Sequence, residues 1–463
     1  MTRAGRATGP ADVSDPEQLA RRREQRAWNW YDWANSGYFT TIGTVLFAPW
    51  LIHVAERAAG PCRGPGCVRT VSLLGLHLAT GSLPAYLTSF ATIAGAVLLP
   101  VVGALVDRSP RKKAHMAGYA WLGAAFAATL FWVDGDRWQL GAVAIIASNV
   151  LAGCSLVSYY AILVDISTED ERDRVSSHGW AWGYLGGGLL LAANLAVVGL
   201  HGALGISESL AVRVSLLSAA LWWAGFTLIP WLRLRDHPVR HEGGGSGSLL
   251  QRSFGQLAAT LRELPRYPMT LRFLLAYLFY NDGIQTVIVS ASTYGEEQLG
   301  LGASVLIATI LLVQFVAFGG ALLFGRLAGR FGAYRLILWG TVGWMAVVLL
   351  AYPLPHGRAV PFLALAVLIA VVMGGTQALS RSFFSLLIPR GREGEYFSLY
   401  QACERGTSWF GTLLFGLVFQ LTGSYRPAIV ALVVFFVLGA ALLLLVDPAR
   451  GARDAGNRLP RTG

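Results

Sequence analysis

The chain has 463 residues, of which 54% are hydrophobic and only 14% are charged, and its mean hydropathy is +0.51. A soluble globular chain carries about 25% charged residues, so this composition excludes an ordinary soluble protein and indicates a polytopic helical membrane protein. The net charge of +11 does not indicate nucleic-acid binding, because the arginines fall between apolar segments in the positive-inside pattern rather than in one soluble domain.

The first 27 residues are polar and end in a basic stretch that contains Arg21, Arg22, Arg23 and Arg26. The apolar segment that follows is too long for the h-region of a cleavable signal peptide. We therefore expect this segment to remain in the bilayer as the first span, with the N-terminus in the cytoplasm.

Twelve apolar segments each meet the requirement of about 20 residues for a helix that crosses a bilayer. They lie at about residues 28–53, 83–106, 114–133, 140–164, 180–200, 210–232, 273–293, 301–323, 336–352, 360–388, 396–421 and 428–446. The predicted organisation is a cytoplasmic N-terminal segment (1–27), a six-helix bundle (28–235), a cytoplasmic central loop (236–267), a second six-helix bundle (268–447) and a cytoplasmic tail (448–463).

Loop charge predicts that both termini are cytoplasmic, because basic loops face that side of the membrane. Arginines gather in the N-terminus, after the second span, in the central loop, after the eighth span and in the tail. Lys112 and Lys113 are the only lysines, a bias typical of a bacterial genome rich in GC, so we expect an inner-membrane protein. Residues 249–264 form an amphipathic stretch that suits the cytoplasmic leaflet, with an ordinary polar linker as the alternative.

Cys62 and Cys67 lie in a loop rich in Gly and Pro between the first two spans, on the side opposite to the termini. That side is oxidising, so a disulfide between them is one interpretation and two free thiols are the other. A metal site is disfavoured because neither a histidine nor a second cysteine pair is near. Cys154 and Cys403 lie in apolar spans and are expected to be packing residues.

The stretch from Gly103 to Lys113 follows the second span and reads G-A-L-V-D-R-S-P-R-K-K. It resembles the cytoplasmic signature of the major facilitator superfamily, and a weaker copy follows the eighth span. In that superfamily the motif controls conformational change and does not bind substrate; a generic basic loop is the alternative. The resemblance assigns a gating role to six residues: Gly103, Asp107, Arg108, Arg111, Gly325 and Arg330.

Each half of the chain also opens with an acidic motif in or beside an apolar span. Residues 31–36 read Y-D-W-A-N-S and contain Asp32, and residues 280–286 read Y-N-D-G-I-Q-T and contain Asp282. An ionisable side chain inside a membrane is costly, so it is usually functional or paired. One at a matching place in each half suggests a duplicated transporter with its site between the halves.

The block around Asp32 resembles the Y-D-W-A-N-S-x-[YF] signature of the unknown major facilitator family, which is related to the fungal vacuolar amino-acid effluxers of autophagy. Residues 179–187, 280–287, 374–382 and 397–400 fit the same family, and the resemblance extends from about Trp28 to the last span. It implies an all-α membrane protein with the major facilitator fold of about twelve helices in two pseudo-symmetric bundles. From the fungal relatives it further implies efflux of neutral amino acids.

Seven polar side chains in the spans are candidates for binding substrate or ions. Asp282 lies near the middle of its span and is a candidate proton site, with a structural hydrogen bond to a neighbouring helix as the alternative. Arg381 suits a substrate carboxylate, with snorkelling to the interface as the alternative. Asp32 and Glu404 are further proton candidates. The alternative for Asp32 is an interface residue paired with a nearby arginine, and the alternative for Glu404 is a helix-packing partner. The full set is Asp32, Asn35, Asp282, Gln285, Gln377, Arg381 and Glu404.

The sequence contains no P-loop, no H-E-x-x-H and no G-x-S-x-G motif, and its eight histidines are scattered. We therefore expect no enzymatic activity, no cofactor and no bound metal, and transport driven by a gradient of substrate or protons. The predicted function is secondary transport of a small solute by a monomer in the lipid bilayer, with proton-coupled efflux of neutral amino acids as the leading hypothesis. An exporter of drug-like or other metabolites and a non-transporting scaffold with this fold are the alternatives.

Overall fold

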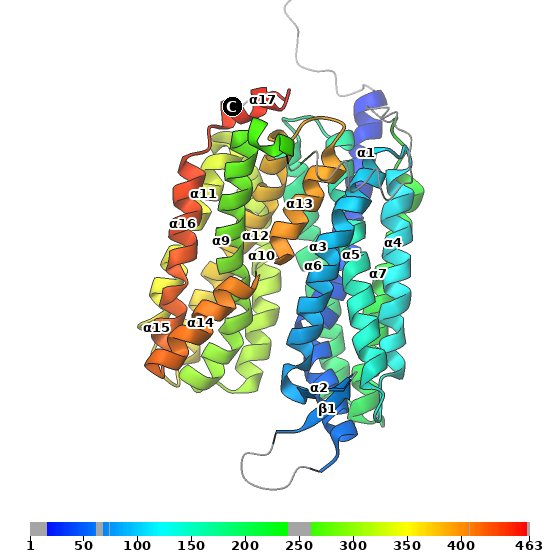
Figure 1. Cartoon of the computed structure of the whole chain (residues 1–463), viewed down its shortest axis with the longest axis vertical. Coiled ribbons are helices and arrows are strands. Elements are labelled where there is room, and N and C mark those ends of the chain that lie inside the picture. Colours follow the sequence, from blue (N-terminus) through cyan, green and yellow to red (C-terminus); the bar gives the residue numbers. More distant parts are fainter. Residues whose placement is uncertain are drawn as a thin grey trace, which may run out of the picture.

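The protein is described by a computed structural model that covers residues 16–61, 68–73, 75–238, 260, 262–406 and 408–460. Long helices stand side by side in two groups, which we call the first and second bundles (Figure 1). The helices of the first bundle are α1 (Pro16–Tyr38), η1 (Phe39–Leu46), α2 (Phe47–Ala59), η2 (Thr80–Ser82), α3 (Leu83–Asp107), α4 (Lys112–Ala128), η3 (Thr129–Trp132), α5 (Trp138–Ile166), α6 (Arg172–Gly199) and α7 (Glu208–Arg233).

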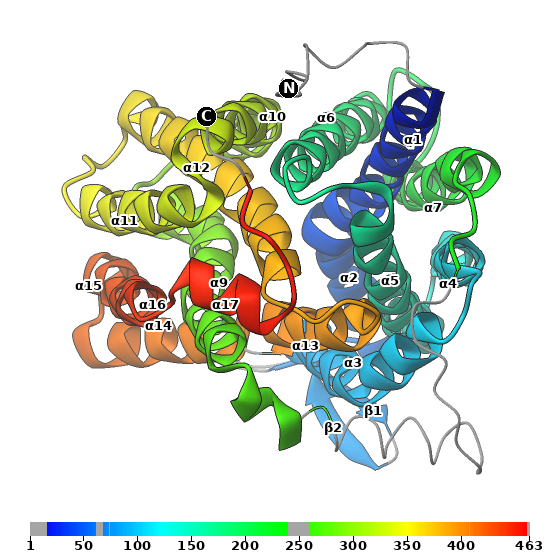
Figure 2. The ribbon, with the colours of Figure 1, turned by 90° about the horizontal axis from the view of Figure 1, so that it is seen from above.

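The second bundle lies beside the first when the molecule is seen from above (Figure 2). Its helices are η4 (Leu264–Arg266), α9 (Pro268–Thr293), η5 (Tyr294–Gln298), α10 (Ala303–Phe331), α11 (Ala333–Ala351), α12 (Ala359–Leu386), α13 (Glu393–Gly406), α14 (Ser408–Thr422), α15 (Tyr425–Ala431), α16 (Val433–Leu444) and α17 (Pro448–Asp454). This arrangement confirms the predicted all-α fold of two helical bundles.

The start of α1 and the C-terminal helix α17 lie at one end of the molecule, which we call the termini face (Figure 1). The opposite end, the hairpin face, carries the antiparallel strands β1 (Thr70–Leu73) and β2 (Leu76–Ala79). These strands were not predicted, because the Gly/Pro-rich loop before them indicated only irregular structure. Gly75 sits in the turn at φ +84°, a conformation that glycine adopts without strain.

Nine helical segments in the described residues are long and apolar enough to cross a membrane, against twelve expected segments. The first of them, Pro16–Ala59, continues well beyond the predicted span. Three expected spans fall outside the nine for identifiable reasons. The helix α4 begins with the polar residues Lys112, Lys113 and His115, and α9 is made more polar by Asn281, Asp282 and Gln285. The eleventh span is described as α13 and α14, on either side of residue 407, which lies outside the described residues.

Large apolar side chains cover the outside of both bundles, as expected where lipid replaces water as the solvent. Examples are Leu232, Val289 and Leu421, which are 67%, 67% and 76% exposed. The aromatic rings of Trp28 and Trp223 are instead fully buried inside the first bundle. The apolar pattern therefore separates a lipid-facing surface from a core that includes aromatic rings.

Two sequence predictions fall on residues outside the described part of the chain. These are the disulfide between Cys62 and Cys67 and most of the amphipathic stretch at residues 249–264. Cys154 is buried and Cys403 is half-buried, and both pack among apolar side chains.

Candidate functional site

The two bundles meet at a buried ion pair between Asp32 of α1 and Arg381 of α12. Both terminal guanidinium nitrogens of Arg381 lie 3.2 Å from Oδ2 of Asp32. Arg381 is 1% exposed and Asp32 is 7% exposed, so neither charge is solvated by bulk water. The sequence predicted each side chain as a binding residue but did not predict that they contact each other across the two bundles.

Further hydrogen bonds fix both members of this pair. Tyr159 of α5 donates its hydroxyl to Oδ2 of Asp32 at 2.7 Å. Nε of Arg381 donates to Oγ of Ser176 at 2.9 Å, and a terminal nitrogen donates to the Ser176 carbonyl at 2.9 Å. Buried charges are stable only when they are paired and hydrogen-bonded, and these contacts supply both conditions from three helices of the first bundle.

Four aromatic rings surround the guanidinium of Arg381. Its central carbon lies 4.8 Å from the ring centroid of Trp28, 5.5 Å from Tyr159, 5.1 Å from Tyr160 and 5.6 Å from Trp180. Aromatic faces attract a cation most strongly where water is absent. Trp28, which precedes the Asp32 motif on α1, is therefore part of the site together with three rings from α5 and α6.

Glycines of α6 allow α1 to approach closely enough to form this site. A Cβ at Gly179 would collide with Oδ2 of Asp32 and would lie 2.9 Å from the Trp28 ring. A Cβ at Gly183 would lie 2.6 Å from the Ser36 hydroxyl. These close approaches give a physical reason for the glycines in the motif at residues 179–187.

Gln377 and Asn35 lie on the same two helices as the ion pair. Oε1 of Gln377 accepts a hydrogen bond from the Tyr184 hydroxyl of α6 at 2.9 Å, which is a second contact between the bundles. Asn35 is 4% exposed, and within the described residues its Nδ2 has no hydrogen-bond partner. A buried donor without a partner is costly, so Asn35 is a group that a bound polar solute would satisfy.

Asp282 occupies a different position, at the junction between α9 and α14. Its Oδ2 accepts the backbone N–H of Gly411, near the start of α14, at 2.9 Å. Its Oδ1 is buried and has no partner among the described residues, and Gln285 one turn further on is half-buried.

Glu404 and Arg405 of α13 are connected through Gln401 rather than directly. Nε2 of Gln401 donates to Glu404 at 2.7 Å, and Nε of Arg405 donates to Oε1 of Gln401 at 3.1 Å. Arg405 also donates to the carbonyl of Asn149 in α5 at 3.2 Å, which joins the two bundles again. Sequence reasoning missed Gln401, although its spacing of three and four residues places it on the same helix face.

The predicted gating motif contacts the second bundle through its glycine and its aspartate. Asp107 accepts the backbone N–H groups of Gly394 and Glu395, at 2.6 and 2.9 Å, and so caps the start of α13. A Cβ at Gly103 would collide with the Gly394 carbonyl, so α3 and α13 pack with their backbones in contact. Lys112 adds an ion pair with Asp165 at 2.8 Å.

The second copy of the motif makes a matching contact between α10 and α6. A Cβ at Gly325 would lie 2.5 Å from Cβ of Ser177. Its Arg330 instead lies over the ring of Phe331 at 5.4 Å, within its own bundle. The backbone N–H of Arg111 donates a hydrogen bond to Oγ of Ser109 at 3.2 Å. Arg108 also has an interaction partner.

Further hydrogen bonds join α6 to α12 and its C-terminal loop on the termini face. Arg172 donates to the Ser385 carbonyl at 3.2 Å, and Ser382 donates to Asp173 at 2.6 Å. Arg390 and Glu169 form an ion pair between the adjoining loops. These polar contacts between the bundles continue from the termini face to the Asp32–Arg381 ion pair. In the described residues, no group of three His, Cys, Asp or Glu side chains is arranged to hold a metal ion.

The fold defines a class of protein. It matches that of the fucose transporter FucP in its outward conformation, with a TM-score of 0.66, 13% identity and coverage of 93% of this chain and 99% of that chain. It also matches the proton:xylose symporter XylE, with a TM-score of 0.69, 12% identity and coverage of 94% and 98%. The architecture is therefore that of a major facilitator superfamily transporter.

The family follows from sequence comparison. The model described as "Vacuole effluxer Atg22 like" matches residues 20–456, so the chain belongs to the Atg22-like family and is a multi-pass membrane transporter. It is 31% identical to the uncharacterized MFS-type transporter YxiO of Bacillus subtilis, over 92% of this chain and 95% of that protein. It is 27% identical to autophagy-related protein 22-1 of Phaeosphaeria nodorum, over 83% and 79%. The predicted family resemblance is confirmed.

Proposed function

We propose that the protein exports a small zwitterionic solute, a neutral amino acid, by alternating access between its two bundles. The observation that carries this proposal is the buried Asp32–Arg381 pair. An amino acid presents a carboxylate that suits the guanidinium of Arg381 and an ammonium group that suits Asp32. When the bundles separate, each member of the pair loses its partner, and a zwitterion compensates both charges together. The family description as an effluxer supports the direction of transport.

In this proposal the structure represents the state closed at the termini face. The contacts of Asp107 with α13, of Gly325 with Ser177 and of Ser382 with Asp173 would all have to break before that face could open. The fold also resembles FucP in its outward conformation. Opening would expose the ion pair to the solute, and closure would restore the direct contact between Asp32 and Arg381.

Asp282 is the proposed proton site, with Glu404 as a second candidate. The Oδ1 atom of Asp282 is buried without a partner in the described residues, so protonation would not break the hydrogen bond that Oδ2 accepts from Gly411. Asp282 is in the second bundle and is not hydrogen-bonded to Arg381, so solute and proton would bind at separate places. This separation is what coupling through a conformational change requires.

We further propose that the termini face lies in the cytoplasm of a bacterial inner membrane, with bundle boundaries at residues 28–235 and 268–447. The supporting observation is the basic character of that face, where Arg326 and Arg335 are exposed. In intact cells, an impermeant thiol reagent should fail to label Arg335→Cys and should label it after permeabilisation. Labelling in intact cells would reverse the assigned orientation.

Counterflow in proteoliposomes tests the transport proposal. Labelled leucine and tyrosine are offered to the wild type, Arg381→Lys, Asp282→Asn and the matched control Asp136→Asn, whose side chain is exposed in a loop. We expect saturable uptake by the wild type and the control, and a KM raised at least about tenfold by Arg381→Lys because lysine cannot form the bidentate contact. Asp282→Asn should retain exchange but lose stimulation by a pH gradient.

The outcomes separate the parts of this proposal. No uptake of any neutral amino acid by folded protein would remove the substrate assignment and favour an exporter of other metabolites. Uptake that is unchanged in Arg381→Lys would remove the ion pair from the binding site. Gradient stimulation that persists in Asp282→Asn would place the proton site elsewhere, and its loss in Glu404→Gln would assign it to Glu404. The absence of gradient stimulation in the wild type would exclude proton coupling.

A further inference from the structure

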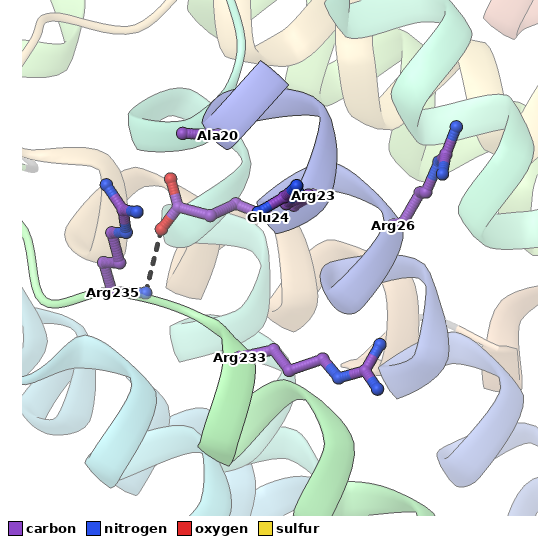
Figure 3. A pocket seen from close by; sticks show the side chains of 6 residues that line it. All are labelled: Ala20, Arg23, Glu24, Arg26, Arg233 and Arg235. Atoms are coloured by element: carbon purple, nitrogen blue, oxygen red, sulfur yellow. Dashed lines mark hydrogen bonds between the residues drawn. The ribbon is translucent and has the colours of Figure 1, made fainter. Parts of the chain in front are cut away.

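A basic cavity lies on the termini face, away from the contact between the bundles. It has a volume of about 360 Å³ and is lined by Ala20, Arg23, Glu24 and Arg26 of α1, by Arg233 at the end of α7, and by Arg235 (Figure 3). Four exposed arginines thus line the cavity, and their guanidinium groups point in different directions (Figure 3). None of them takes part in the ion pairs and central contacts described above.

Within the described part of the chain Glu24 attracts Arg235 electrostatically, but the arginines of this cavity form no close ion pair. No acidic side chain there forms an ion pair with Arg23, Arg26, Arg233 or Arg235. Glu24 is the only acid in the lining, and its Oε1 is engaged by the backbone N–H of Arg235 at 2.8 Å and by Nε2 of His237 at 3.4 Å. The carboxylate of Glu24 therefore holds the chain after α7 against α1 and leaves the arginines available to an anion.

The lining also indicates which kind of anion fits. The last turn of α7 below Arg233 carries Leu228, Trp231 and Leu232, which are 44%, 38% and 67% exposed. These apolar side chains belong to the lipid-facing surface, and tryptophan is common where hydrocarbon meets head groups. Basic cavities between transmembrane helices at a membrane interface are suited to phospholipid head groups. A ligand that joins a phosphate to an acyl chain would satisfy the arginines and the apolar side chains together.

We infer that this cavity between α1 and α7 binds the head group of an anionic phospholipid. The phosphodiester contacts the arginines, since guanidinium groups bind phosphate in bidentate geometry. The acyl chains follow α7 past Leu232. The inference does not depend on the proposed substrate, nor on the orientation of the protein, because it concerns the membrane leaflet at the termini face.

The position of the cavity connects it to the central site. Glu24 precedes Asp32 by eight residues on the same helix, which is a rise of about 12 Å. A lipid bound between α1 and α7 would hold α1 within the first bundle. It would therefore stabilise the helix that carries half of the ion pair.

Native mass spectrometry of the full chain tests this inference with phosphatidylglycerol, phosphatidylcholine and inorganic phosphate as separate probes. The test variant combines Arg23→Gln with Arg233→Gln. The control combines Arg335→Gln with Arg453→Gln, two exposed arginines of the second bundle on the same face. We expect phosphatidylglycerol to bind the wild type and the control with similar affinity. The affinity of the test variant should fall roughly thirtyfold, because each of the two arginines contributes about 1 kcal/mol and about 1.4 kcal/mol corresponds to a factor of ten.

A second variant identifies the source of the phosphate. Leu232→Asn should weaken phosphatidylglycerol binding and leave inorganic phosphate unaffected, because only the lipid contacts α7 below the cavity. Equal losses in test and control variants, or none in the test variant, would overturn the inference. Displacement of the lipid by millimolar phosphate, together with unchanged binding in Leu232→Asn, would assign the cavity to a free phosphate anion instead.

Discussion

Arg381 holds a positive charge where bulk water does not reach, and its compensating charge comes from the other bundle. Such a pair contributes little net stability relative to apolar residues, but removing one partner leaves an uncompensated buried charge. The contact therefore links the solvation of a charge on one bundle to the position of the other bundle. The other groups that contact the guanidinium are aromatic rings and Ser176, which carry no charge. Asp32 is therefore the acidic group among the hydrogen-bond partners of Arg381 in the described residues.

A double-mutant cycle tests this interpretation. Asp32→Asn or Arg381→Gln alone should lower the free energy of unfolding by about 3–5 kcal/mol, as removal of one partner from a buried pair does. The double variant should lose clearly less than the sum of the two. Denaturant unfolding in detergent measures all three, and additive losses would show that the two charges do not depend on each other.

His237 gives a pH-dependent contribution outside the membrane. Its interaction with the Glu24 carboxylate 3.4 Å away raises its pKa above the ordinary value of about 6.5. The interaction therefore stabilises the fold fully below pH 6.5, and this contribution is lost as the pH rises through the folded-state pKa. Melting temperatures from pH 5.5 to 8.5 should fall more steeply for the wild type than for His237→Gln. His77→Gln, at an exposed position, is the control and should follow the wild type.

At the residue scale, the sequence indicated which side chains matter but not how they pair. Asp32 and Arg381 were identified because ionisable groups in apolar spans are costly. Their contact joins residues 349 positions apart, and no local pattern encodes such a distance. Tyr159 and Ser176 were missed as partners of the ion pair for the same reason, since hydroxyl side chains are common in membrane helices and have no distinctive spacing.

At the element scale, helix packing on the termini face depends on contacts that only glycine allows. Gly103 of α3 meets the backbone of Gly394, and Gly325 of α10 meets Ser177 of α6. Asp107 adds its two hydrogen bonds to the start of α13. One contact is therefore contributed by each copy of the gating motif, and each joins a helix of one bundle to a helix of the other.

Substituting Gly103 should open this contact. A Cβ in Gly103→Ala would collide with the Gly394 carbonyl, and backbone atoms cannot move aside as a flexible side chain can. We expect α3 and α13 to separate and the backbone amides of Gly394 and Glu395, which donate to Asp107, to exchange hydrogen at least about tenfold faster. Gly118→Ala in α4 has open space around its Cβ and should leave the rate unchanged. Equal rates in both variants would contradict the proposed contact.

The helices themselves were largely predictable, because runs of about 20 apolar residues identify them. One departure has a local cause, because the polar triplet in α9 lowers its hydropathy below that of the other spans. The position of Asp282 against Gly411 is a tertiary contact between two spans, so periodicity within either span could not reveal it.

On the scale of the whole molecule, alternating access requires the bundles to move relative to each other. Asp173→Cys and Ser382→Cys, which replace a hydrogen-bonded pair of α6 and α12, would form a crosslink between bundles in a cysteine-free background. We expect oxidation to abolish transport and reductant to restore it. The control pair, Asn194→Cys and Ser218→Cys, replaces a contact within the first bundle and should have no effect. Full transport by the crosslinked pair between bundles would contradict movement at this face.

The aromatic rings around Arg381 have a spectroscopic consequence. Trp28 and Trp180, on helices of the first bundle, lie next to a cation carried by the second bundle. Indole emission responds to a nearby charge, so separation of the bundles should change the intrinsic fluorescence without any attached label. Because the chain has 15 tryptophans, the signal belongs to this site only if it disappears in Trp28→Phe/Trp180→Phe. The ring of aromatic side chains that stabilises the ion pair would then also report, in real time, whether the pair is intact.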